Sequence, residues 1–373
     1  MKRLSTFSYL FAAILLSFNL VLVNCSGTDD PDGPTEDFDI AGTYCLNFSL
    51  VGSEIVISAT NTLGTFDIAI NDYDGGLWSG SGSGTLNNNT LNVSGTMATE
   101  AGTANFELDL TVNESQESVE GIFHVLGPQG SELFNSSLKG AKGACAFELS
   151  PDDISDIIGQ PYLTALHVEL DKIEKISRYR SAAGHNFVDY SGESCVNLKH
   201  YFHTYDEGEP PAQSELPSTL TYFVPANGTI VTIGQARPSD DPDDYEIDIQ
   251  LDANPNVIVR VFHLTPSTGI EVGASVSAGD VLGASPSAQL DSGDFAVYVK
   301  TNQGYRLLSM FEIMSNEVLD QYIARGVSQN WRQDLYYDEA DDYPAQITCE
   351  NGTWGNLRHP ESRFELDFFV LDN

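Results

Sequence analysis

The chain has 373 residues, and its 54 acidic and 17 basic side chains give a formal net charge of −37 at pH 7. A field of this sign repels the phosphates of nucleic acids and of anionic lipid surfaces, so we expect no nucleic-acid partner. High solubility explains the charge without an acidic binding site.

The first 25 residues have the pattern of an export signal. The basic start Met1–Arg3 precedes an apolar run from Leu4 to Val23, and Cys25 lies two residues beyond that run. The pattern resembles a bacterial lipoprotein signal, which implies that Cys25 is lipidated and becomes the mature N-terminus. A plain secretory signal is the alternative. No aspartate follows Cys25, so the resemblance to Gram-negative lipoproteins implies an outer-membrane lipoprotein anchored through Cys25.

Residues 26–37 are small and acidic and include proline and glycine, which predicts a solvated linker. Residues 38–148 are predicted to form a first domain. Its short β-branched runs, separated by turn residues, predict strands at Gly42–Leu50, Glu54–Thr60, Thr65–Asn71, Leu77–Thr85, Thr90–Thr96, Ala104–Val112, Ser118–Leu126 and Ser131–Leu138. This pattern indicates an all-β domain, either a small up-and-down barrel of lipocalin-like type or a β-sandwich.

Residues 149–373 are predicted to form a second, mainly β domain. A short helix is expected from Pro151 to about Ile158, because proline is favoured in the first helical turn. Strands are predicted at Leu220–Val224, Thr229–Gly234, Tyr245–Leu251 and Val257–His263. Near the end, a helix that follows Met314 and stops at Gly326 is expected, and then a strand at Phe364–Leu371.

Three motifs of this second domain lie close together in the sequence. They are Pro225-Ala226-Asn227-Gly228-Thr229-Ile230, Phe262-His263-Leu264 and a glycine-spaced run from Val272 to Gly283. The stretch resembles the β-barrel of the M23 (LytM-type) peptidoglycan metallopeptidases, which share their fold with lipoyl and biotinyl carriers. The resemblance implies an all-β protein whose C-terminal domain is an M23-like, lipoyl-like barrel with a short helical extension.

The same resemblance allows the active site to be compared residue by residue. In that family zinc is bound by an H-x-x-x-D motif and by the second histidine of an H-x-H motif. His185 and Asp189 have the H-x-x-x-D spacing, and His263 stands at the acid–base histidine. Asp294 and Ala296 stand where the two H-x-H histidines would be, so one of three protein ligands is missing. Strand alternation puts Asp294 and Ala296 on one face, so Asp294 could complete an altered zinc site.

Two functions therefore remain open for the barrel. A degenerate M23-like domain would bind peptidoglycan or an envelope protein without hydrolysing it and would need no cofactor. The alternative is a divergent zinc metallohydrolase, similar to a peptidoglycan endopeptidase, with His185, Asp189 and Asp294 at the metal and His263 as the acid or base. The missing H-x-H motif favours the first function.

The cysteines other than Cys25 are distributed by domain. Cys45 and Cys145 bracket the first domain, and Cys195 and Cys349 bracket most of the second. In an oxidising compartment this predicts two disulfides. The pairing Cys45–Cys145 with Cys195–Cys349 is expected because it respects the domain boundary. No C-x-x-C spacing occurs, which argues against zinc binding by these cysteines.

Overall fold

The computed structural model describes residues 40–372 with gaps at 49–50, 61, 73–77, 100–101, 114–116, 128–129, 131, 144–150, 190–192, 205–219, 236–242, 287–291, 302–303, 339–340, 350–356 and 359–363. The predicted signal peptide (1–25), Cys25, the linker (26–37), Cys145 and the boundary between residues 148 and 149 lie outside the described residues. Ile40–Asn373 forms one compact unit. Within the described ranges, no helix has the length and apolar character needed to cross a membrane.

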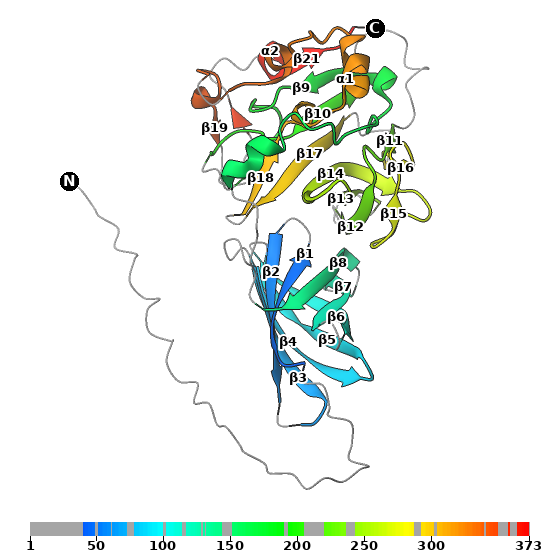
Figure 1. Ribbon diagram of the computed structural model, residues 1–373. Helices are drawn as coiled ribbons and strands as arrows, with labels where there is room; N and C mark the ends of the chain where they lie inside the picture. Colours follow the sequence, from blue (N-terminus) through cyan, green and yellow to red (C-terminus); the bar gives the residue numbers. More distant parts are fainter. Residues whose placement is uncertain are drawn as a thin grey trace, which may run out of the picture. The chain divides into compact units, whose positions relative to one another are not determined.

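The first part of the chain is a closed antiparallel barrel of eight strands (Figure 1). The strands are β1 (Gly42–Phe48), β2 (Val51–Ala59), β3 (Thr65–Asp72), β4 (Trp78–Asn87), β5 (Thr90–Thr99), β6 (Gly102–Asn113), β7 (Ser118–Leu126) and β8 (Glu132–Lys142). Each pairs with the next, and β8 returns to β1. Of the two predicted architectures, the barrel is the one found.

Alternating side chains fill the interior of this barrel. On β3, Phe66, Ile68 and Ile70 are buried while Asp67 between them is exposed. Strand β6 repeats the pattern over Phe106–Leu110. Since successive strand residues point to opposite faces, the two-residue period alone places a packed core inside the barrel.

The second part is built around one sheet in which the strands pair in the order β21, β9, β10, β17, β14, β13, β12. Its strands are β9 (Ile173–Ser177), β10 (His200–Thr204), β11 (Thr221–Phe223), β12 (Gly228–Gln235), β13 (Tyr245–Leu251), β14 (Asn254–Pro266), β15 (Ser275–Val276), β16 (Val281–Ala284), β17 (Ser292–Thr301), β18 (Gly304–Leu308) and β21 (Phe368–Val370). A separate pair comprises β19 (Thr348–Cys349) and β20 (Leu357–Arg358). Strand β8 also pairs with β12, so the first barrel and this sheet share backbone hydrogen bonds.

The helices are short and few in the described ranges. They are α1 (Asn316–Ile323), α2 (Trp331–Leu335) and α3 (Phe364–Asp367), with 3₁₀ turns η2 (Pro151–Asp156), η3 (Leu170–Lys172), η4 (Met310–Glu312) and η5 (Pro344–Gln346). The helix predicted after Met314 is confirmed as α1, which Ser315 caps by accepting a hydrogen bond from the Val318 amide.

Two predicted elements differ from what is found. The helix expected from Pro151 is the 3₁₀ turn η2. The strand predicted at Phe364–Leu371 is wrong for its first half, which is the helix α3; only Phe368–Val370 forms strand β21. At this junction the Asp367 carbonyl accepts from the Arg178 amide and its carboxylate accepts from the Ala182 amide. These contacts fix Asp367 ahead of the residues that pair with β9.

The disulfide predicted between Cys195 and Cys349 is present. It joins the segment that leads into β10 to strand β19, across 154 residues of chain. Cys45 is also disulfide-bonded, but its predicted partner Cys145 lies outside the described residues.

Strand β17 separates two apolar clusters and thereby positions the site. Phe295, Val297 and Val299 pack in the main core, whereas Ala296 and Tyr298 pack in a second cluster on the opposite face. Because side chains alternate along the strand, Asp294 lies on the face of Ala296 and Tyr298.

Candidate functional site

The site forms where β10, β14 and β17 meet. Tyr201 on β10 lies opposite Asp294 on β17 in the antiparallel register. Lys199 is two residues before Tyr201, so alternation carries its side chain toward the same face as Asp294. His185 reaches the site from the irregular segment between β9 and β10. Gly184 before it has φ +73°, and a Cβ there would lie 2.3 Å from the Tyr201 hydroxyl oxygen, so this close approach requires glycine.

A buried lysine occupies the centre of the site. Lys199 Nζ lies 2.6 Å from Asp294 Oδ2, and both side chains are 2 % exposed. The same nitrogen is 3.3 Å from His185 Nε2. It also lies 4.4–4.7 Å from the centroids of three aromatic rings, those of Phe187, Tyr201 and Phe262. The carboxylate supplies the opposite charge and the ring faces add cation–π attraction, so the ammonium is stabilised on several sides.

The hydrogen bonds of His185 assign its tautomer. Its Nδ1 lies 3.0 Å from the Asn186 carbonyl oxygen, which can only accept, so Nδ1 carries the proton. Its Nε2 lone pair then accepts from Lys199. Burial and the Lys199 charge both lower the pKa of His185. The imidazole is therefore neutral, and it directs its lone pair at a cation.

His263 forms an acid–base pair with Asp244. It lies in an irregular stretch of β14, where φ of His263 is +60° and the register with β13 shifts. Its Nδ1 is 3.0 Å from Asp244 Oδ2, and its Nε2 is 3.7 Å from Asp294 Oδ2. Burial opposes protonation, but the Asp244 hydrogen bond and the Asp294 charge outweigh it and raise the pKa of His263. With 22 % of its side chain exposed, His263 can exchange protons with solvent.

Asp189 is held away from the lysine. Its Oδ2 accepts a 2.6 Å hydrogen bond from the Leu307 amide of β18 and a 3.2 Å bond from Arg306 Nε. Of the residues predicted for the site, the structure therefore gathers His185, Asp294 and His263 near Lys199 and ties Asp189 to β18. Ala296, at the position of the second H-x-H histidine, packs in an apolar cluster.

These side chains do not fit a zinc ion in the arrangement described. Zinc bonds to histidine nitrogen and carboxylate oxygen are about 2.0–2.2 Å long. The Lys199 ammonium already lies between His185 Nε2 and Asp294 Oδ2, and a metal bound by both would meet its charge. Among the residues that the structure describes, no three His, Cys, Asp or Glu side chains form a group able to hold a metal.

Two residues of the site, Lys199 and Asp244, were not predicted from the sequence. For Lys199 a signal was present, because it is a single cation inside the largely apolar and aromatic run Val196–Phe202. Lysine is almost never fully buried unless it is paired, so a buried partner had to be expected. Asp244 directly precedes a strand and carries no comparable signal.

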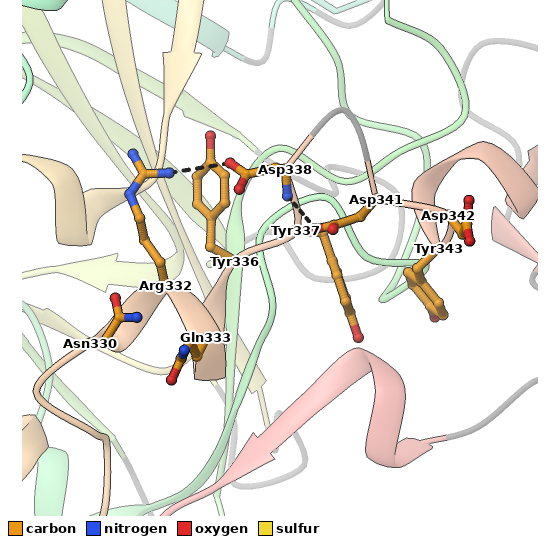
Figure 2. Close-up of a pocket in the computed structure, with 9 residues that line it drawn as sticks. All are labelled: Asn330, Arg332, Gln333, Tyr336, Tyr337, Asp338, Asp341, Asp342 and Tyr343. Carbon is orange, nitrogen blue, oxygen red and sulfur yellow. Dashed lines mark hydrogen bonds and ion pairs between the residues drawn. The ribbon is translucent and has the colours of Figure 1, made fainter.

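A groove of about 620 Å³ lies on another part of the surface (Figure 2). Its lining has aromatic, acidic and amide side chains and one arginine: Asn330, Arg332, Gln333, Tyr336, Tyr337, Asp338, Asp341, Asp342 and Tyr343. The rings of Tyr337 and Tyr343 stack 4.6 Å apart, and their hydroxyls bind Leu366 and Asp367 of α3. The hydrogen bonds of these two hydroxyls therefore connect this side of the groove to α3.

No protein-family model and no curated protein matches the chain. Solved structures similar to it include a putative glycyl-glycine endopeptidase LytM from Ruminococcus gnavus, at 14% identity over 31% of this chain and 44% of that one, with a TM-score of 0.23. Csd3 from Helicobacter pylori shares 9% identity over 64% of this chain and 50% of its own, with a TM-score of 0.27. A zinc-containing peptidase from Vibrio cholerae shares 10% identity over 71% and 86%, with a TM-score of 0.25.

This chain spans about half the length of the first two of these structures. A likeness of this degree carries no inference about activity, which has to be argued from the residues of the site itself.

Proposed function

We propose that this chain is a non-hydrolytic protein of the bacterial cell envelope that binds peptidoglycan through its C-terminal part. The observation that carries the proposal is the buried Lys199–Asp294 pair, 2.6 Å long, at the point where the motif resemblance predicts a zinc ion. The chain has the H-x-x-x-D spacing and the Phe262-His263-Leu264 motif but lacks the H-x-H motif, and a fixed lysine charge lies where the resemblance predicts the metal.

Hydrolysis of an amide bond by a zinc enzyme needs an open coordination position at which water loses a proton near pH 7. Here the His185 lone pair and one Asp294 oxygen are already engaged by Lys199. Asp189, the predicted second ligand, is held by the Leu307 amide. We therefore assign no metal-dependent step to these residues.

The alternative, a divergent metallohydrolase, has one observation in its favour. The His263–Asp244 pair is intact, and a histidine oriented by a carboxylate is the usual form of a general base. For zinc to bind, Lys199 would have to leave Asp294 and Asp189 would have to leave β18. Both changes expose or unpair buried charges, which is why we prefer the binding function.

We further propose that the mature chain is an outer-membrane lipoprotein, anchored by lipid on Cys25 and spaced from the membrane by residues 26–37. The order of basic start, apolar run and cysteine supports this. When the full-length sequence is expressed with a radioactive fatty acid, the wild-type protein should be labelled and the Cys25→Ser variant should not. Labelling that survives the substitution would contradict the anchor.

The binding function is tested with purified residues 26–373, which lack the lipidated Cys25, and insoluble peptidoglycan sacculi. The chain should sediment with the sacculi, contain no stoichiometric zinc and release no soluble fragments. Gln333→Trp, which places a large ring in the groove of Figure 2, tests whether that surface takes part. Gln321→Trp on α1, which is also exposed, is its control. Stoichiometric zinc with fragment release would establish the hydrolase instead, and failure to sediment would point to an envelope protein as the partner.

A further inference from the structure

We propose that the Lys199 ammonium is the cation of this site and that, like a structural metal ion, it holds together the segments that carry His185, Lys199 and Asp294. Shortening the Lys199 side chain therefore leaves a binding site for a primary alkylammonium ion. This inference goes beyond peptidoglycan binding, since it concerns what holds the site together.

The surroundings of the ammonium are those of a bound cation. Lysine has three N–H donors. One is directed at Asp294 Oδ2 at 2.6 Å and one at His185 Nε2 at 3.3 Å. The remaining surface of the ammonium faces rings, of which Phe262 is the nearest at 4.4 Å. A carboxylate, a neutral imidazole and aromatic faces together make a cation site with no need for solvent.

The ammonium also joins segments that are far apart in the chain, as a structural metal does. Lys199 stands before β10, Asp294 on β17 and His185 in the segment that precedes both. Asp294 depends on this contact, because its Oδ1 is buried and finds no hydrogen-bond donor among the described residues. The next group that can carry a positive charge, His263 Nε2, is 3.7 Å from Oδ2. Without Lys199 the carboxylate would lose its shortest ion pair.

The distances select the kind of ion. Separations of 2.6 and 3.3 Å suit hydrogen bonds from an ammonium and are longer than the about 2.0–2.2 Å of zinc bonds. Lys199→Ala removes Cγ, Cδ, Cε and Nζ, which have the shape of n-propylammonium. That ion would restore the charge, the two hydrogen bonds and the contacts with the rings at once.

The test is thermal unfolding of Lys199→Ala with increasing n-propylammonium chloride. We expect the variant to melt below the wild-type chain and its Tm to rise saturably with n-propylammonium. n-Propanol has the same shape without charge, and sodium chloride supplies the ionic strength alone, so neither should raise the Tm. Equal shifts with n-propanol, equal shifts in the wild-type chain, or no shift in a folded variant would each overturn the proposal.

A second variant assigns the effect to the site. Lys199→Ala/Asp294→Asn lacks the carboxylate that holds the ion, and n-propylammonium should leave its Tm unchanged. If Lys199→Ala does not fold alone, its refolding yield should rise with n-propylammonium and not with n-propanol, and an equal yield in both would overturn the proposal. Sedimentation of the wild-type chain with sacculi does not depend on this outcome, so either proposal can fail without the other.

Discussion

Lys199 and Asp294 form a fully buried ion pair, with Nζ 2.6 Å from Oδ2 and 2 % of each side chain exposed. Two ions this deep have both lost their hydration, so each is tolerable only while the other is present. The pair links the start of β10 to β17, two strands that are already neighbours in the sheet. The same ammonium also donates to His185 Nε2 at 3.3 Å, so it connects the segment that carries His185 to both strands.

The first prediction concerns the energetic coupling of this pair. Lys199→Met keeps much of the side chain but removes its charge, so the carboxylate of Asp294 is left buried without its partner. We expect a loss of about 3–5 kcal/mol in the free energy of unfolding, as for other broken buried pairs. Lys199→Met/Asp294→Asn should be more stable than Lys199→Met. Denaturant unfolding of both single variants and the double variant gives the coupling energy. Simple additivity would show that the pair is not a unit.

The second prediction concerns His263. Asp244 holds its Nδ1 and raises its pKa against the effect of burial. Asp244→Asn should therefore lower the pKa of His263, which NMR titration of the ring measures directly. Asp252→Asn, an exposed carboxylate beyond β13, serves as the control. If the pKa of His263 is unchanged in Asp244→Asn, groups other than Asp244 raise it.

The same shift has a consequence for stability, and its sign follows from linkage. A histidine with a raised folded pKa stabilises the fold fully below its unfolded value of about 6.5, and this contribution is lost as pH rises through the folded pKa. As pH rises, the wild-type chain should lose the contribution of His263 to its free energy of unfolding. Asp244→Asn should show a smaller loss in denaturant unfolding over the same range.

The first barrel could be predicted because its signals are local. The alternation of Phe66, Ile68 and Ile70 with polar residues predicts both that the segment is a strand and which of its side chains face inward. Turn residues mark each reversal of chain direction. The sequence could not decide between barrel and sandwich. That choice depends on the pairing of β1 with β8, whose paired residues are 90 to 98 positions apart, and no short pattern reports such a contact.

The candidate site was less predictable because its partners are distant in sequence. The spacing of His185 and Asp189 is local, but Asp189 binds Arg306, 117 residues away, instead of facing the lysine. The partner of Lys199 is 95 residues away on another strand. Placing Asp294 opposite Tyr201 required the register of β10 against β17, which motif matching does not supply.

The third prediction tests the Cys195–Cys349 disulfide. It closes a loop of 154 residues, and the chain-entropy model gives such a cross-link a large effect on the unfolded state. Cys195→Ser/Cys349→Ser should lose about 2–5 kcal/mol of unfolding free energy under non-reducing conditions. A change below about 0.5 kcal/mol, within the usual range for surface substitutions, would show that packing alone holds this segment.

The fourth prediction concerns two buried histidines beneath the site. His167 packs with Phe202 and Phe295, with ring centroids 4.5 and 4.4 Å apart, and burial lowers its pKa to about 3. Burial lowers the pKa of His200 to about 4. Both histidines are neutral in the folded chain at pH values above these pKa values, so they take up a proton only when the chain unfolds.

Between about pH 6.5 and pH 4 the unfolded chain therefore binds protons that the folded chain does not. Stability should fall as pH falls through this window, by up to about 1.4 kcal/mol per pH unit for each histidine. His167→Phe removes one of the two groups and keeps a ring between its aromatic neighbours, so the slope of unfolding free energy against pH should decrease by about half of their joint contribution. Urea unfolding at intervals between pH 4 and pH 7 measures both slopes. Equal slopes would mean that His167 takes up its proton in the folded state, which a ring 3 % exposed and enclosed by phenylalanines should resist.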